Sequence, residues 1–155
     1  MDIAIELVKA ATQEVADLLD ELNTALAGPY AADQRHALPI DQLFQPDIRF
    51  FVARWDGAAV GCGGVAFFDG YAEVKRLYAR PSVRGRGVAK ALLRRIESEA
   101  QDAGATALRL ETGVYQLAAL KFYESAGFRR CGPFGPYLEK PLRTIELSLF
   151  YEKPL

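Results

Sequence analysis

The alternation of hydrophobic and polar residues predicts strands along the whole chain. In residues 2–8, Ile3, Ile5 and Leu7 alternate with Asp2, Ala4 and Glu6, which is the two-residue period of a strand. Similar patterns predict further strands at 49–54, 58–68, 72–79, 106–111, 128–131 and 144–151. Asp56-Gly57 lies between the second and third of these strands and is a typical hairpin turn.

Helical spacing of apolar residues appears between the strands. Thr12 can cap a helix that runs to about Ala27, with Val15 and Leu18 on its apolar face. Further helices are expected from Gly87 to Ala103 and from Gln116 to Ala126. Residues 30–47 are expected to be irregular, with one short helix near 39–45.

This order of elements predicts an α+β fold with a mixed, mostly antiparallel central sheet and helices on both faces. The unit 72–111 should be a crossover between two parallel strands. A chain of 155 residues is expected to form one domain, residues 1–155.

Composition excludes several classes of protein. No apolar run approaches the ~20 residues that span a bilayer, and the first residues lack the features of a signal peptide. Cys62 and Cys131 cannot make a disulfide framework, so we expect a reduced, cytoplasmic protein and treat both as small core residues. His36 is the only histidine, and no metal site is expected.

The net charge of −1 conceals a basic segment at residues 75–95, which carries eight Lys and Arg side chains and no acid. Because these charges cluster around a glycine-rich turn, they suggest that the segment binds an anion of modest size. Nucleic acid would require a wider basic surface, and the remainder of the chain is acidic. For Lys90, Arg94 and Arg95, the alternative is an ordinary solvated helix face.

Residues 84–89, Arg-Gly-Arg-Gly-Val-Ala, join an expected strand to an expected helix. Backbone amides in the first turn of a helix have no partner inside the helix and attract phosphate. Small residues here let phosphate approach, and the arginines add opposite charge. The segment matches neither the dinucleotide fingerprint nor a Walker loop.

Two motifs together resemble the GCN5-related N-acetyltransferase (GNAT) family, in particular its small bacterial members. The family's acyl-CoA loop, [RQ]-x-x-G-x-[GA], is matched by Arg84, Gly87 and Ala89. The later motif, N-x-x-A-x-x-[LF]-Y-x-x-x-G-F, is matched by the following residues of 110–128: Ala119, Phe122, Tyr123, Gly127 and Phe128. Gln116 stands where the family often has Asn.

The resemblance implies direct transfer of acetyl from acetyl-CoA to a primary amine in a ternary complex. It also implies that the diphosphate lies on the segment formed by Arg84, Gly85, Arg86, Gly87, Val88 and Ala89. Backbone groups of Leu77, Tyr78 and Ala79 would pair with the pantetheine arm like an added strand. Gln116, Ala119 and Phe122 would complete the cofactor site.

The reaction requires an acid for the departing thiolate and a base for the attacking ammonium. By resemblance Tyr123 is the acid, with a plain core tyrosine as the alternative. Glu73 is the candidate base, acting through water, against the alternative of a solvent-facing glutamate. Glu111 is the competing base, unless it merely pairs with Arg109 or Arg76.

His36, Glu111 and Tyr137 are candidates for contact with the acceptor, which we expect to be a small molecule. Acetylation of a protein lysine or N-terminus, and a non-catalytic acyl-CoA-binding module, remain alternatives. Neither nucleic acid nor membrane is an expected partner. The identity of the acceptor and the oligomeric state, including a homodimer, are left open by the sequence.

Overall fold

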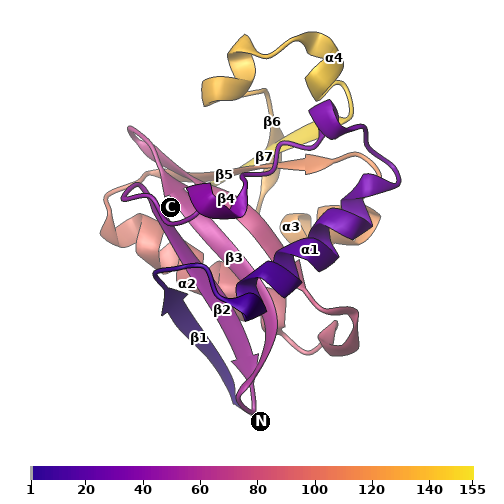
Figure 1. The fold of residues 1–155 in the computed structure, drawn as a ribbon. Helices are drawn as coiled ribbons and strands as arrows, with labels where there is room; N and C mark the ends of the chain where they lie inside the picture. Colours follow the sequence, from indigo (N-terminus) through magenta and orange to yellow (C-terminus); the bar gives the residue numbers. More distant parts are fainter. Residues whose placement is uncertain (1) are drawn as a thin grey trace.

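The computed structural model describes residues 2–155 and is built around a seven-stranded sheet in the order β1-β2-β3-β4-β5-β7-β6 (Figure 1). The strands are β1 (Ile3–Val8), β2 (Ile48–Trp55), β3 (Ala58–Phe67), β4 (Tyr71–Ala79), β5 (Ala107–Gly113), β6 (Arg129–Cys131) and β7 (Ser148–Pro154). Every neighbouring pair is antiparallel except β4 and β5, which are parallel. The expected mixed sheet and the parallel unit are therefore confirmed.

Three of the four helices within residues 2–155 occupy the positions expected from the apolar spacing, and the short fourth one was not expected. The helices are α1 (Gln13–Ala27), α2 (Val88–Asp102), α3 (Leu117–Ser125) and α4 (Leu142–Ile145), with 3-10 turns η1 (Ala32–Gln34), η2 (Ile40–Gln42), η3 (Pro81–Val83) and η4 (Gly135–Glu139). Thr12 caps α1, because its Oγ1 accepts a hydrogen bond of 3.2 Å from the amide of Val15. The short helix expected near 39–45 is only the 3-10 turn η2.

One strand boundary was wrong. The strand expected at 144–151 begins only at Ser148, because α4 precedes it. Pro141 fixes the backbone before α4, and its carbonyl accepts bonds from the amide (2.9 Å) and the hydroxyl (2.7 Å) of Thr144. These local bonds take precedence over the alternating pattern of the sequence.

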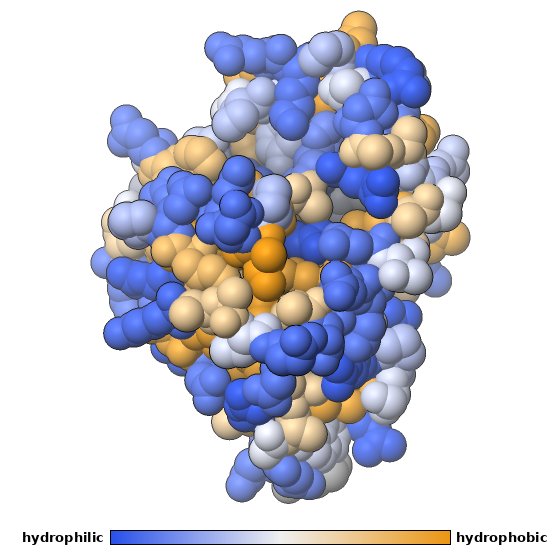
Figure 2. Space-filling view, viewed as in Figure 1, coloured by the Kyte–Doolittle hydropathy of each residue, from blue (hydrophilic) through white to orange (hydrophobic). Residues whose placement is uncertain are grey.

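Both faces of the sheet are covered, as the alternation along β2 shows. Phe50 and Val52 pack with α1 on one face, whereas Phe51 and Ala53 pack with α2 and with Tyr123 of α3 on the other. Figure 1 shows α1 crossing in front of the sheet and α2 behind it. In the space-filling view the front face is mostly polar, with apolar side chains gathered near its middle (Figure 2).

Strands β4 and β5 separate after a short paired region, and this separation positions the site. They pair only from Tyr71 to Glu73, opposite residues 107–109. Beyond this point β4 contains a bulge at Arg76, whose φ is +54°, and its register against β3 shifts by one residue. The bulge bends β4, so its later residues have no partner on β5.

No helix in the described part of the chain has both the length and the apolar character needed to cross a membrane.

Candidate active site

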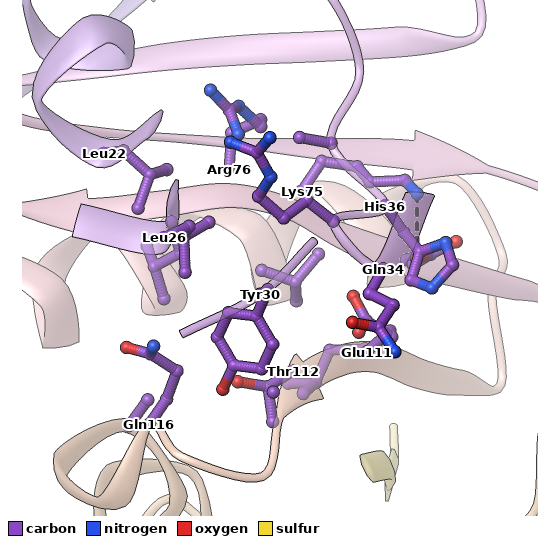
Figure 3. A pocket seen from close by; sticks show the side chains of 18 of the residues that line it. Leu22, Leu26, Tyr30, Gln34, His36, Lys75, Arg76, Glu111, Thr112 and Gln116 are labelled. Carbon is purple, nitrogen blue, oxygen red and sulfur yellow. Dashed lines mark ion pairs between the residues drawn. The ribbon is translucent and has the colours of Figure 1, made fainter. Parts of the chain in front are cut away.

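A cavity of about 150 Å³ lies where β4 and β5 diverge. Side chains from α1 and from the segment after it form one wall, and β4, β5 and α3 form the others. Figure 3 shows Leu22 and Leu26 on one side, Gln116 and Thr112 on another, and Lys75, Arg76 and Glu111 around the rest. The site thus combines an apolar wall with several ionisable groups.

The glycine-rich segment forms a left-handed turn before α2. Gly85 and Gly87 have φ values of +78° and +87°, which glycine adopts without steric cost. A Cβ atom at either position would meet no atom within 4 Å, so backbone conformation, not crowding by the protein, requires glycine here. Helix α2 begins at Val88, with Gly87 as its N-cap.

The amides of this turn are available to an anion. The first backbone bond into α2 runs from the amide of Ala91 to the carbonyl of Gly87. Within residues 2–155, no hydrogen bond involves the amides of Gly85, Gly87, Val88 or Ala89. Unpartnered amides at a helix N-terminus with open space before them suit the diphosphate of coenzyme A.

The neighbouring arginines stay exposed. Arg84 contacts the carbonyl of Ala79 through its Nε at 3.4 Å, and the Arg86 guanidinium lies 5.5 Å from the centre of the Trp55 ring. Neither is paired with a carboxylate in the described chain, so both can contact a bound phosphate.

Leu77, Tyr78 and Ala79 lie at the end of β4 that pairs with β3 but has no partner on β5, between the cavity and the glycine-rich turn. Leu77 lines the cavity. The Tyr78 side chain is buried against α1, and its hydroxyl donates to Glu21 at 3.1 Å. Tyr78 can therefore contact a ligand only through its backbone. This geometry fits a strand-like ligand along β4, as the sequence suggested.

Helix α3 supplies the opposite wall. Gln116, Ala119 and Tyr123 line the cavity, whereas Phe122 packs against the core and does not reach it. Tyr123 is buried between Phe122 and Phe128, with ring centroids 5.5 and 5.7 Å away. Burial, reinforced by the negative charge of Glu111, raises the pKa of Tyr123, so its hydroxyl stays protonated.

Glu73 is not a solvent-facing glutamate. Its side chain is 2% exposed and forms an ion pair of 2.9 Å with Lys75. The hydroxyl of Tyr137 donates a second bond of 2.7 Å to the same oxygen, and Lys75 Nζ lies 3.3 Å from that hydroxyl. Burial and the charge of Glu73 raise the pKa of Tyr137 and hold it in the donating form.

Glu111 faces the same cavity from β5. Its carboxylate accepts a hydrogen bond of 2.6 Å from Ser148 of β7. It pairs with neither Arg109, which contacts Glu152, nor Arg76, which contacts Asn23, so the alternative that Glu111 merely pairs with one of these arginines is wrong. Desolvation by burial raises the pKa of Glu111 to about 7, despite the opposing hydrogen bond from Ser148.

His36 joins the two segments that cover the cavity. Its Nε2 donates to the carbonyl of Thr144 at 2.6 Å, so in the neutral ring Nδ1 accepts from Lys140 at 3.1 Å. Burial, together with the nearby lysines, lowers the pKa of His36 and favours this neutral form. Its ring packs edge-on against Tyr137, 5.5 Å between centroids. Both ring nitrogens are engaged, so His36 can contact an acceptor only through its ring edge.

Several residues of the cavity were not expected from the sequence. Lys75 and Arg76 belong to the basic segment that suggested an anion of modest size, and the structure places them in the lining of the cavity. Tyr30, Arg35 and the partner of Glu111, Ser148, carried no signal in the sequence. They come from irregular segments or from the far end of the chain. Within residues 2–155, no group of three or more His, Cys, Asp or Glu side chains is placed to hold a metal ion.

Comparison with known proteins adds independent information. A model of the acetyltransferase (GNAT) family matches residues 12–128. The IAA acetyltransferase of Azospirillum brasilense is 48% identical over 143 residues, covering 91% of this chain and 90% of that protein.

Solved structures share the fold. An acyl-CoA N-acyltransferase from Klebsiella pneumoniae superposes with a TM-score of 0.79 and 30% identity, covering 99% of this chain and 97% of that one. The PaiA N-acetyltransferase of Thermoplasma acidophilum, determined in complex with coenzyme A, has a TM-score of 0.73 and 21% identity, with coverage of 98% and 99%.

Proposed function

Because this chain belongs to the acetyltransferase (GNAT) family and is an N-acetyltransferase, we propose that it acetylates the primary amine of a small molecule. The donor is acetyl-CoA, and the acetyl group passes directly to the amine while both substrates are bound. The new N–C bond forms as the C–S bond of the thioester breaks. The amine loses one proton and the departing thiolate gains one.

The turn before α2 is the proposed diphosphate site. The unpartnered amides of Gly85, Gly87, Val88 and Ala89 support this, as do the exposed arginines 84 and 86. Acetyl-CoA supplies an activated acyl group when bound. The protein orients it along the end of β4 that has no partner on β5, where a backbone N–H in residues 77–79 can stabilise negative charge developing on the thioester oxygen.

Tyr123 is the proposed general acid. It lines the cavity from α3 and carries its proton at neutral pH, as protonation of the departing thiolate requires. No side-chain hydrogen bond of the described residues involves the hydroxyl of Tyr123, which lines the cavity, whereas the hydroxyl of Tyr137 donates to Glu73. Tyr123 therefore has a proton to donate without breaking an existing bond.

Two carboxyls compete for the role of base. Glu73, the first choice from the sequence, already accepts bonds from Lys75 and Tyr137. Glu111 has a pKa of about 7, which is suited to taking a proton and releasing it near neutral pH. We therefore place Glu111 first as the base, and assign Glu73 to holding Lys75 and Tyr137 in position.

The observation that carries the small-molecule proposal is the cover over the cavity. In Figure 1 the segment after α1 lies against the C-terminal segment with α4. Gln34 bonds the carbonyl of Arg143 at 3.2 Å and Glu146 at 3.3 Å, while Arg143 also pairs with Asp33. His36 adds its bond to Thr144. These contacts cover one side of the cavity and leave it partly open, which favours a compact acceptor over a polypeptide that crosses the cavity.

Two measurements test this function. Acetyl-CoA at millimolar concentration should raise the melting temperature by several degrees, because it binds only the folded protein. A panel of small amines should then release CoA thiol, while lysine-containing peptides should not. A thermal shift without thiol release from any amine would indicate a CoA-binding module, and preference for peptides would indicate a protein acetyltransferase. No thermal shift would contradict the cofactor assignment itself.

A further inference from the structure

Arg35 and Arg76 differ from the other half-buried arginines of the chain. Each of the others has a carboxylate partner within salt-bridge distance: Arg54, Arg80, Arg95 and Arg109. None of the ion pairs within residues 2–155 includes Arg35 or Arg76. Both line the cavity. Two cationic side chains thus face the acceptor site without an anion.

Arg76 is the more constrained of the two. It occupies the β4 bulge at a φ of +54°, a conformation that an arginine adopts only under constraint from its surroundings. Its Nη2 donates to the neutral amide oxygen of Asn23 at 2.6 Å, but its Nε is buried without a partner. Desolvation lowers the pKa of Arg76, which expresses the cost of burying this charge.

Arg35 follows the turn η1. Its Nε, like that of Arg76, is buried and has no hydrogen-bond partner in the described chain. These two nitrogens are the buried side-chain polar atoms left unpaired within residues 2–155. An unpaired buried donor destabilises the folded protein, and more so where the group is charged. A ligand anion in the cavity, beside both guanidinium groups, would stabilise these two half-buried charges.

The acidic groups of the cavity do not neutralise the arginines. Glu73 is committed to Lys75 and Tyr137, so this ion pair has no net charge. Glu111 is held by Ser148 on β5's far side and lies outside salt-bridge distance of either arginine. The positive charge of Arg35 and Arg76 is therefore available to a ligand.

Apolar side chains adjoin this charge. Leu22 and Leu26 of α1, together with Tyr30, form the wall of the cavity next to Arg76, which bonds Asn23 of the same helix (Figure 3). The cavity of about 150 Å³ is smaller than the range of about 300–1,000 Å³ that is usual for drug-sized ligands. The acceptor must therefore be compact, anionic at one end and apolar in its side chain.

We infer that the acceptor is an amino carboxylic acid, whose carboxylate binds Arg35 and Arg76 and whose apolar side chain lies against Leu22, Leu26 and Tyr30. This inference rests on the proposed function. The planar fork of a guanidinium matches a carboxylate in a bidentate manner. The same fork would also match a phosphoryl group, but the small volume and the leucines favour the carboxylate.

The test compares matched acceptors that differ only in the anion. The aliphatic and aromatic amino acids are assayed by thiol release beside their carboxamides and beside phosphoethanolamine. We expect kcat/KM to be about 10- to 100-fold higher for at least one acid than for its amide, the range expected for losing a charged hydrogen bond. Arg35→Gln and Arg76→Gln should each remove this preference by lowering the value for the acid alone. Arg129→Gln, an exposed arginine on β6, should leave it unchanged.

A second readout covers the case in which no acceptor in the panel is turned over. With CoA saturating, N-acetyl-leucine and N-acetyl-phenylalanine should raise the melting temperature of the protein, and their amides should not. The CoA-induced shift in each variant shows that it is folded. Equal values for acid and amide in both assays would overturn the inference, as would a preference for phosphoethanolamine. If acetyl-CoA itself gave no shift, the proposed function would fail first.

Discussion

Tyr137 donates a hydrogen bond of 2.7 Å to the buried carboxylate of Glu73, a residue 64 positions earlier in the chain. This bond ties the segment between β6 and β7 to the strand that borders the cavity. Lys75 completes the group at 2.9 Å from the same carboxylate oxygen. The segment between β6 and β7 and strand β4 are therefore joined in one hydrogen-bonded unit.

Tyr137→Phe tests this unit. The substitution leaves the buried Glu73 with Lys75 as its one partner, so we expect a loss of about 1–3 kcal/mol in the free energy of unfolding. The KM for the acceptor should rise, and the KM for acetyl-CoA should change little. Urea denaturation and steady-state kinetics measure the two effects. Tyr115→Phe is the control, because that side chain is 57% exposed. Equal effects from both substitutions would contradict the role of the bond.

Glu111→Gln should alter how stability depends on pH. The folded-state pKa of about 7 lies above the ordinary value of 4.5, so the folded protein binds the proton more tightly than the unfolded chain. The native protein should therefore lose stability as pH rises from 4.5 through 7. The glutamine variant avoids this loss and should match the native protein near pH 4.5. At pH 8 it should be more stable, by at most about 3 kcal/mol.

Chemical denaturation at pH 5 and pH 8 measures this difference. Glu139→Gln, at an exposed position on η4, supplies the control and should show the same pH dependence as the native protein. A Glu111→Gln variant that loses stability equally at both pH values would show that Glu111 is not held with a raised pKa.

The pH dependence of the rate separates the two candidate bases. If Glu111 takes the proton from the amine, kcat/KM should fall below a pKa of about 7 in the native protein. Glu111→Gln should lower the rate and abolish this fall of kcat/KM at low pH. Glu73→Gln should lower the rate by disturbing Lys75 and Tyr137, but the fall of kcat/KM at low pH should remain. The reverse pattern would assign the base to Glu73.

Tyr123→Phe isolates the acid. The ring and its packing against Phe128 remain, and only the hydroxyl is lost. We expect kcat to fall by about 10²-fold or more, as is usual for the loss of a general acid. The dissociation constant for CoA should stay within about twofold, because in this account the hydroxyl acts on the departing thiolate and not in binding. An unchanged kcat would show that Tyr123 is only a core residue and not the acid.

Gly87→Ala probes the turn before α2. Alanine at a φ of +87° costs about 1–2 kcal/mol and should shift the amides that bind the diphosphate. The dissociation constant for CoA, measured by calorimetry, should therefore rise. Each loss of about 1.4 kcal/mol in the binding free energy corresponds to a tenfold increase. Gly28→Ala is the matched control, since Gly28 has a φ of −70° and open space around it. Equal affinity in both variants would argue against this turn as the binding site.

Local patterns were sufficient to predict most of the fold. The strands, the three main helices and the glycine turn follow from the period of apolar residues and from glycine's access to positive φ, and both signals act within a few residues. The bulge at Arg76 gave no such signal. Residues 72–79 read as an unbroken strand, and the positive φ of Arg76 accompanies the register shift against β3.

The acceptor end of the site was predictable only in part. Glu73, Glu111 and Tyr137 were named from the sequence, but their partners Lys75 and Ser148 were not. The cover depends on bonds such as His36 to Thr144 and Gln34 to Arg143, between residues more than 100 positions apart. Contacts of such long range leave no periodic trace in the sequence, so the burial of Glu73 and the unpaired arginines required the structure.

The central claim is that the free amides before and within the first turn of α2 bind the diphosphate of coenzyme A. The most direct measurement is an amide chemical-shift titration of the isotope-labelled protein with CoA. We predict that the amides of Gly85, Gly87, Val88 and Ala89 show the largest shifts of the whole backbone. If those four signals stayed in place while CoA bound elsewhere, or if CoA did not bind, the claim would be contradicted.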